Sequence, residues 1–334
     1  MISKLLYGYI ITQCLYVAAK LNIADHLENG SKSIEELATL TDTHYDSLNR
    51  VLRCLVTHGI FQIDENDRYA LNDDALELLS DNENTLKDYV ILCGEELYQS
   101  AGELLFTVKT GKSSFEKIYK QSHWQYLECH SDKAQIFHNA MEKGSQKLHD
   151  EILKHYDFSS YKQIVDVGGG KGHLLCDILA KYPATDGIVF DLKHAEQLSN
   201  EYVNSRNLEK RCQFISGNFF ESIPENADLY LLKTILHDWS DEHALNILRN
   251  CKRAMKENSK LLIIEKVVNI TPNDTALLGD INMLAMYSGK ERTLTEFQSL
   301  LNQAGLQLNC KINTDTAFSI VEAVLKLSFI TSAN

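Results

Sequence analysis

Proline is scarce in this chain, with three residues in 334, and no segment is of low complexity. A long flexible linker would need one or the other, so we expect domains that are joined by helices. The first 19 residues are fairly apolar, but Gly8, Thr12 and Gln13 interrupt the run, which is also too short to span a bilayer. We therefore predict a cytoplasmic protein with no membrane partner.

Basic residues are also few, because 33 Lys and Arg face 46 Asp and Glu, which gives a net charge of −13. Proteins that bind nucleic acids concentrate basic residues, so we expect no nucleic-acid partner. The eight cysteines are widely spaced without a CxxC pair, which favours neither a zinc site nor a disulfide scaffold. With 44% apolar residues, a chain of this length is predicted to form about two domains, each with its own core.

Residues 1–79 show an order of elements that is typical of a winged helix. Ser33 and Glu36 form a capping box before a short helix, and Thr43 is expected to cap the next helix, which ends near Gly59. Two short strands with a polar turn between them are expected to follow: residues 60–63, the turn 64–67, and residues 68–71.

A winged helix can bind DNA, so a transcription regulator that senses a ligand stays open as an alternative. Residues 1–80 hold six basic residues against twelve acidic ones, a net charge of −6, which disfavours it. Their apolar helices exceed what one small module can bury. They predict a protein interface, most simply a homodimer through the amino-terminal domain.

The pattern changes after a helical stretch at residues 85–157. From Tyr161 onward, apolar strand-like runs alternate with helical ones: residues 164–167, 187–190, 212–215, 228–232, 261–264 and 318–325. This alternation predicts an α/β domain with a parallel, doubly wound sheet. We accordingly divide the chain into a winged-helix dimerisation domain (1–84), a helical connector that contributes to the substrate pocket (85–157) and a catalytic domain (158–334).

Ligands of such sheets bind beyond the carboxyl ends of the strands, and the first strand ends in a glycine loop. Gly168, Gly170 and Gly172 follow the spacing GxGxG, which permits close approach of a ligand to the main chain. The dinucleotide fingerprint GxGxxG would need glycine where His173 stands, so a nicotinamide dehydrogenase is disfavoured.

Two aspartates accompany this loop. Asp166 precedes it, and Asp191 stands 19 residues beyond Gly172 at the end of the second strand, where a carboxylate can accept hydrogen bonds from both hydroxyls of a ribose. The alternative is that the two carboxylates only cap the helices that follow them.

His237 follows the fourth strand, and Glu265 ends the fifth. These strands are neighbours in the usual order, so the two side chains can share one pocket as an acid–base dyad. An ordinary surface or core histidine is the alternative, with Asp238 as a common acid at the start of a helix.

The motifs together resemble the S-adenosylmethionine-dependent O-methyltransferases of the caffeate, hydroxyindole and polyketide type. Six segments carry the resemblance: Val165–Gly172, Phe190–Leu192, Gly217–Phe220, Leu232–Glu242, Leu262–Glu265 and Gly289–Thr293. It implies a Rossmann-like class I methyltransferase domain with a mostly parallel seven-stranded sheet and helices on both faces. An all-helical winged-helix dimerisation domain would precede it.

The resemblance also implies roles for single residues. S-adenosyl-L-methionine, whose product is S-adenosyl-L-homocysteine, would be bound by Asp166, Gly168, Gly170, Asp191, Asn218, Phe219, Lys233 and Trp239. Asp191 would hold the ribose, while Phe219 and Trp239 would enclose the adenine. His237 would be the general base on the acceptor hydroxyl, flanked by Glu265 and Glu291. The acceptor would contact Phe137, Met141, Asp238 and Tyr287, although Phe137 and Met141 are equally well explained as core residues.

Asn218 departs from the family, which usually has aspartate there to accept a hydrogen bond from the adenine amino group. The amide oxygen can still accept one bond, so about 1 kcal/mol of cofactor binding is at stake. Thr293 and Glu296 form a capping box, which would explain that threonine structurally.

The predicted reaction is methylation of a hydroxyl, most simply a phenol, on a small aromatic molecule. Two carboxylates would stabilise the imidazolium of His237, and no group of oxygen ligands suited to magnesium is recognisable, so no metal is expected. Methylation of carbon or nitrogen, or loss of methyl transfer on the same scaffold, stays open as an alternative.

Overall fold

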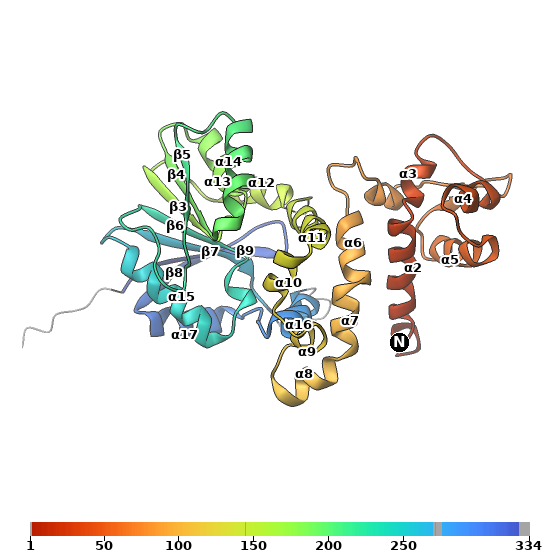
Figure 1. The fold of residues 1–334 in the computed structure, drawn as a ribbon. Coiled ribbons are helices and arrows are strands. Elements are labelled where there is room, and N and C mark those ends of the chain that lie inside the picture. Colours follow the sequence, from red (N-terminus) through yellow and green to blue (C-terminus); the bar gives the residue numbers. More distant parts are fainter. Residues whose placement is uncertain (1, 144, 270, 272–275, 327–334) are drawn as a thin grey trace, which may run out of the picture. The chain divides into compact units, whose positions relative to one another are not determined.

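The computed structural model describes residues 2–143, 145–269, 271 and 276–326. The chain forms two compact units, Met1–Gln146 and Lys147–Asn334 (Figure 1). Among the described residues, no helix is both long and apolar enough to cross a bilayer.

The first unit begins with the predicted winged helix. Its elements are α1 (Ile2–Leu5), α2 (Gly8–Lys20), α3 (Ile23–Leu27), α4 (Ile34–Leu40), α5 (Tyr45–Thr57), β1 (Gln62–Ile63), β2 (Tyr69–Ala70) and the 3-10 helix η1 (Asp74–Leu78). β1 and β2 pair in antiparallel fashion around the predicted turn. A core that includes Leu37, Leu52, Leu55 and Phe61 lies between these helices and the hairpin.

The starts of two helices test the sequence prediction directly. The capping box is confirmed, because Ser33 N donates to Glu36 Oε2 at 2.6 Å and Glu36 N donates to Ser33 Oγ at 3.3 Å. The prediction for Thr43 is wrong, since α5 is capped by His44, whose Nδ1 accepts from the main-chain N–H of Ser47. The Thr43 hydroxyl instead bonds to that of Thr41.

The predicted helical stretch consists of short helices. They are α6 (Lys87–Gly94), α7 (Glu96–Gly102), α8 (Leu104–Thr110), α9 (Ser114–Tyr119), α10 (His123–Cys129), α11 (Ser131–Lys143) and, continuing into the second unit, α12 (Gln146–His155). Within the first unit, α6 packs against both α2 and α11.

The second unit is built on a seven-stranded sheet in the order β5-β4-β3-β6-β7-β9-β8. Its strands are β3 (Gln163–Val167), β4 (Asp186–Asp191), β5 (Cys212–Ser216), β6 (Leu229–Lys233), β7 (Lys260–Lys266), β8 (Leu306–Asn313) and β9 (Phe318–Leu325). The first five are parallel, and β9 pairs in antiparallel fashion with both β7 and β8. The mostly parallel seven-stranded fold is therefore confirmed, although the edge strand β8 was not recognised among the apolar runs.

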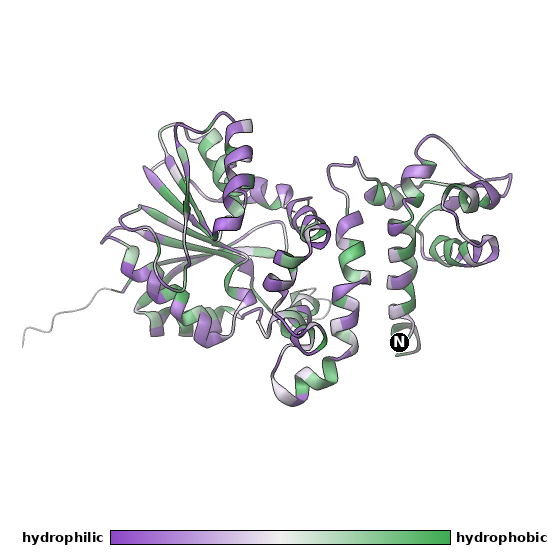
Figure 2. Cartoon of the chain, in the orientation of Figure 1, coloured by the Kyte–Doolittle hydropathy of each residue, from purple (hydrophilic) through white to green (hydrophobic). Residues whose placement is uncertain are grey.

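Side chains alternate between the two faces of this sheet. Ile164 packs with the buried side chains of α12, α13 (His173–Lys181) and α14 (Glu196–Ser205), whereas its neighbour Val165 packs with those of α15 (Asp241–Ala254) and α17 (Leu294–Ala304). Figure 2 shows the strands mainly in the colour of hydrophobic residues, as expected for a sheet that is covered on both faces.

The strand order places the site. The chain moves outward from β3 through β4 to β5 and then returns to the other side of β3 with β6. The loops after β3 and β6 consequently lie beside each other at the switch point, where open α/β sheets bind their ligands. The remaining elements are the 3-10 helices η2 (Lys193–Ala195) and η3 (Leu236–Asp238) and the helix α16 (Ala276–Tyr287).

Candidate active site

The glycine loop after β3 needs its glycines. Gly168, Gly170 and Gly172 have φ of +72°, +57° and +83°, which residues with a side chain rarely adopt. A Cβ on Gly168 would lie 2.5 Å from Cδ1 of Ile235, whereas a Cβ on Gly170 would meet no atom within 4 Å. The loop thus touches the segment that leads to His237 and keeps an open face at Gly170, as a cofactor cradle requires.

Asp191 supports this cradle from β4. Gly170 N donates to Asp191 Oδ2 at 2.8 Å, and Leu192 N donates to Oδ1 at 2.6 Å. No side chain caps α13 or η2, which excludes the reading of Asp166 and Asp191 as mere helix caps. Asp166 is 3% exposed, and its burial raises its pKa to about 7, against the opposing effect of Lys233.

Three aromatic rings gather beside the loop. The rings of Phe219 and Trp239 are 6.1 Å apart at 80°, and those of Phe220 and Trp239 are 4.7 Å apart at 89°. Phe219 Cε1 would lie 3.7 Å from a Cβ on Gly168, so this group is continuous with the glycine loop. The rings meet edge to face, and the predicted enclosure of an adenine by Phe219 and Trp239 stays a prediction.

Asn218 has local partners for both of its polar atoms. Its Oδ1 accepts from Phe220 N at 3.0 Å, and its Nδ2 donates to Glu221 Oε1 at 3.3 Å. The amide therefore suits a position beside Glu221, where a second carboxylate would be repelled.

Asn218→Asp is expected to tighten S-adenosylhomocysteine binding by no more than about fivefold, because a charged acceptor gains about 1 kcal/mol on the adenine amino group. Glu221 opposes that gain, so Asn218→Asp with Glu221→Gln is expected to bind more tightly than either single variant. Calorimetric titration measures all three. Weaker binding by the double variant than by wild type would contradict a role of residue 218 in adenine recognition.

His237 lies on η3 among three carboxylates. Its Nδ1 is 3.0 Å from Glu291 Oε1 and 3.9 Å from Glu265 Oε2, and its Nε2 is 3.5 Å from Asp238 Oδ1. A carboxylate only accepts hydrogen bonds, so the proton on Nδ1 points to Glu291 and Nε2 is the nitrogen that can take a proton. The imidazole is 16% exposed and can be reached from outside.

Glu265 has a different task from Glu291. Its Oε1 accepts from three successive main-chain N–H groups, those of Ile235, Leu236 and His237, at 3.1, 2.8 and 3.3 Å. Among the described residues, Oε2 has no hydrogen-bond partner and faces the imidazole as a charge. Glu265 thus holds the main chain beneath His237, while Glu291 orients the ring.

The pKa values of this group follow from burial and charge together. Burial alone would favour the neutral imidazole, but Glu265, Asp238 and Glu291 outweigh it and raise the pKa of His237 to about 10. Burial raises the pKa of Asp238 to about 7, and it also raises that of Glu265. Burial lowers the pKa of Lys233, with Asp166 and Glu265 opposing the shift.

The segment 289–292 is pressed against the loop that carries His237. A Cβ on Gly289 would lie 2.2 Å from the carbonyl oxygen of His237, and Lys290 N donates to that oxygen at 2.8 Å. Sequence reasoning assigned a role only to Glu291 in this segment. It missed Arg292, which is fully buried although arginine usually lies at the surface, and its place directly after Glu291 was the available signal.

The predicted acceptor contacts fall in both units. Phe137 lies on α11 of the first unit, edge-on to the rings of His123 and Trp124 at 5.2 and 5.9 Å. Met141 on the same helix is 43% exposed, which does not fit a core residue. Tyr287 ends α16 in the second unit, and burial and the charge of Asp238 raise its pKa well above the ordinary value. The roles of all three stay predictions.

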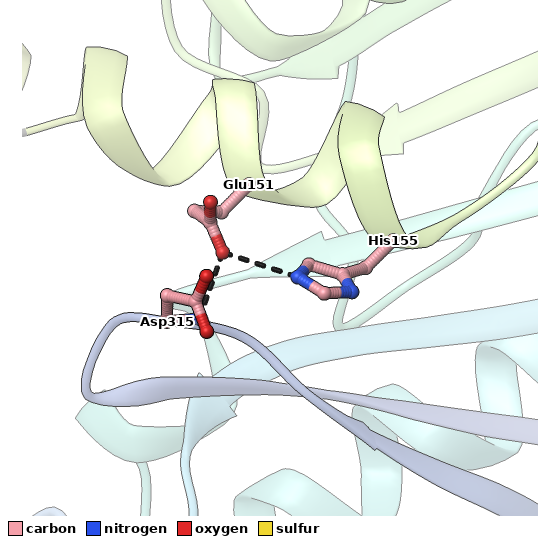
Figure 3. Close-up of side chains that lie close together, drawn as sticks. All are labelled: Glu151, His155 and Asp315. Atoms are coloured by element: carbon pink, nitrogen blue, oxygen red, sulfur yellow. Dashed lines mark hydrogen bonds and ion pairs between the residues drawn. The ribbon is translucent and has the colours of Figure 1, made fainter.

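A second histidine–carboxylate cluster links α12 to the β8–β9 turn (Figure 3). Glu151 Oε2 accepts from Asp315 N at 2.7 Å and lies 3.2 Å from His155 Nε2. Lys154 Nζ pairs with Glu151 at 3.0 Å and with Asp315 at 2.8 Å. Because a lysine already neutralises these acids, the cluster is explained as a structural link and supplies a matched control for His237.

Known proteins resemble this chain over almost its whole length. The family model of an O-methyltransferase domain matches residues 102–307, and that of an O-methyltransferase dimerisation domain matches residues 3–81. The phenazine O-methyltransferase PhzM of Lysobacter antibioticus is 36% identical over 323 residues, covering 96% of this chain and 94% of that protein. A phenazine-1-carboxylate N-methyltransferase of Pseudomonas aeruginosa is 30% identical over 295 residues, with 88% and 87% covered.

A solved structure extends the likeness to three dimensions. The O-methyltransferase NcsB1 from neocarzinostatin biosynthesis, in complex with S-adenosylmethionine and 2-hydroxy-5-methyl naphthoic acid, has a TM-score of 0.85 at 30% identity. The match covers 94% of this chain and 95% of that one.

Proposed function

The chain belongs to the family of S-adenosylmethionine-dependent O-methyltransferases, and from this we propose that it methylates a hydroxyl of a small aromatic molecule with His237 as general base. The relatives act on aromatic natural products, and a phenolic hydroxyl is the acceptor that suits the base best. The observation that carries the proposal is that Nδ1 of His237 faces both Glu291 and Glu265, two positions beyond Ile235, the residue beside the glycine loop.

The methyl donor is S-adenosylmethionine, whose sulfonium supplies an electrophilic methyl group when bound. Gly168 and Gly170 would lie beneath its methionine part, Asp191 would accept from its ribose hydroxyls, and Phe219 with Trp239 would hold its adenine. The open face at Gly170 and the carboxylate of Asp191 beside it fit this ligand. Asp166 and Lys233 would complete the polar end of the site.

Proton removal is the task of His237. An ordinary imidazole with a pKa of about 6.5 is poorly matched to a phenol with a pKa near 10. In this site, the surrounding carboxylates raise the pKa of His237 to about 10 despite its burial, so proton transfer from a phenol to Nε2 is close to balanced. Glu291 holds the ring with Nε2 free to act, and Asp238 and Tyr287 lie near enough to orient the acceptor.

Methylation of a nitrogen is the second candidate, because one relative is named an N-methyltransferase. A ring nitrogen that carries a lone pair has no proton to lose, so such an acceptor would not require His237. The dependence of turnover on His237 separates the two functions.

We further propose that residues 1–84 form a homodimer, since the family model that matches residues 3–81 is that of a dimerisation domain. The first helices carry exposed apolar side chains, among them Ile2 and Leu5, which are 76% and 73% exposed. Such side chains are typical of an interface. Residues 85–157 would contribute to the acceptor pocket through Phe137 and Met141, and residues 158–334 would be the catalytic domain.

Titration of the chain with S-adenosylhomocysteine tests the cofactor site without knowledge of the acceptor. Micromolar or tighter binding is expected, and Asp191→Ala is expected to weaken it at least tenfold, because two hydroxyl hydrogen bonds to a carboxylate are lost. Asp186→Ala at the other end of β4 is the control and should bind like wild type. Absence of binding by wild type, or equal binding by Asp191→Ala, would contradict the assignment.

A further inference from the structure

Arg292 is the largest fully buried side chain in the described part of the molecule. Its main chain is bound to the segment that follows β7, because Val268 N donates to Arg292 O at 3.0 Å. A buried guanidinium is costly unless its N–H groups find acceptors, so the partners of Arg292 reveal what it does.

Four hydrogen bonds and an ion pair hold this guanidinium. Nη1 donates to Leu236 O at 2.8 Å and to Lys290 O at 3.2 Å, while Nη2 donates to Trp239 O at 2.8 Å. Nε and Nη2 each lie 2.9 Å from Asp241 Oδ1. Three of the four acceptors are main-chain carbonyls and the fourth is the carboxylate of Asp241, so Arg292 mainly fixes the path of the main chain.

Two of these carbonyls, those of Leu236 and Trp239, belong to the loop after β6 and lie on either side of the proposed general base in the sequence. Leu236 precedes His237, and Trp239, whose ring belongs to the aromatic group beside the glycine loop, follows it by two positions. η3 itself is only three residues long, too short to hold its own geometry. The loop is therefore held from outside, by Glu265 on its N–H groups and by Arg292 on its C=O groups.

We propose that Arg292 is a positioning residue for methyl transfer, which fixes the imidazole of His237 relative to the ring of Trp239 by holding the carbonyls of Leu236 and Trp239. The proposal rests on the proposed function of His237 and Trp239. Arg292 itself would touch neither the acceptor nor the cofactor. Its removal should act on rate, because a displacement of about 1 Å between reacting groups can cost about a hundredfold.

Arg292→Lys separates charge from geometry. A lysine keeps the positive charge, but its three N–H groups on one nitrogen cannot reach acceptors on opposite sides of the loop. Arg211→Lys is the matched control, because Arg211 also binds main-chain carbonyls, those of Leu179 and Thr185, at the opposite end of the strands. If Arg292 only stabilised the fold, Arg292→Lys and Arg211→Lys should have the same effects.

The experiment has two readouts, one of which needs no acceptor. With Trp124→Phe as background, Trp239 is the single tryptophan, and acrylamide quenching of its fluorescence reports how firmly the loop is held. Arg292→Lys is expected to at least double the quenching constant and to lower kcat about thirtyfold or more, with KM for the acceptor within threefold of the background. Arg211→Lys should leave both readouts at the background level.

Background-like quenching and kcat in a folded Arg292→Lys variant would overturn the proposal, as would equal losses in Arg211→Lys. If Arg292→Lys does not fold, Asp241→Ala is the deciding variant. It removes the hydrogen-bond acceptor of Nε and the ion-pair partner of Nη2, and the side chain of Asp241 is 56% exposed. We expect quenching to rise and kcat to fall at least threefold, and no change would overturn the proposal. Failure of wild type to bind S-adenosylhomocysteine would instead refute the proposed function, since quenching tests the loop independently.

Discussion

His237→Gln is expected to lower kcat for a phenolic acceptor by about a thousandfold while S-adenosylhomocysteine binds with wild-type affinity. Proton removal by a positioned base typically contributes about 10² to 10⁴ in rate, and Nε2 of His237 is the nitrogen left free for it by the bond from Nδ1 to Glu291. Glutamine is of similar size and has no basic nitrogen. Steady-state kinetics with saturating acceptor and calorimetry with S-adenosylhomocysteine measure the two quantities.

The control for this variant is His155→Gln. His155 also lies beside a glutamate, at 3.2 Å from Glu151, but in the link between α12 and the β8–β9 turn (Figure 3). Wild-type turnover is expected for it. A kcat for His237→Gln within about threefold of wild type would show either that the acceptor loses its proton without His237 or that, like a ring nitrogen with a lone pair, it has no proton to lose.

The meeting of His237 with Glu265 could be predicted from the sequence for a definite reason. Strongly apolar runs mark β6 and β7 as buried parallel strands, and strands of that kind are neighbours in this fold. Their carboxyl ends then bring the two residues together, and the structure places Nδ1 and Oε2 3.9 Å apart. The hydrophobic pattern and the strand order were thus enough to predict which side chains lie close together in the site.

The parts that escaped prediction depend on other forces. β8 lies at the sheet's edge, where alternate residues such as Gln307 and Asn309 are polar, so it lacks an apolar run. The division of work between Glu265 and Glu291 depends on rotamers, and the partners of Arg292 are mainly carbonyl groups that every residue has. Sequence patterns record side-chain types, so contacts that end on the main chain leave little trace in them.

Glu291→Gln is expected to lower the plateau of kcat by about a hundredfold or more and to change its pH dependence. A glutamine can donate its amide N–H to Nδ1, which would place the imidazole proton on Nε2 and leave no base toward the acceptor; loss of the orienting carboxylate in a serine-protease triad costs about 10⁴ by the same tautomer error. The pH dependence of kcat should change as well. As the proposed general base, His237 would act when deprotonated, and with its pKa near 10 we expect wild-type activity to fall as the pH drops below that value. Removal of a carboxylate at 3.0 Å lowers the pKa of His237, so the fall of kcat at low pH should occur about one pH unit or more lower than in wild type.

Glu265→Gln tests the effect of a nearby carboxylate charge on His237 without removing the hydrogen bond between Glu291 and the ring. Its amide oxygen can still accept from the N–H groups of Ile235, Leu236 and His237, so the loop should remain in place. Loss of the charge 3.9 Å from Nδ1 lowers the pKa of His237, so the fall of kcat at low pH should move to lower pH. The tautomer of His237 should not change, and the plateau of kcat should stay within about tenfold of wild type. Profiles of kcat from pH 6 to 10.5 for the three proteins measure both effects. An equal loss of plateau in the two variants would mean that both carboxylates act only through charge, and the assignment of Glu291 as the group that orients the ring would be wrong.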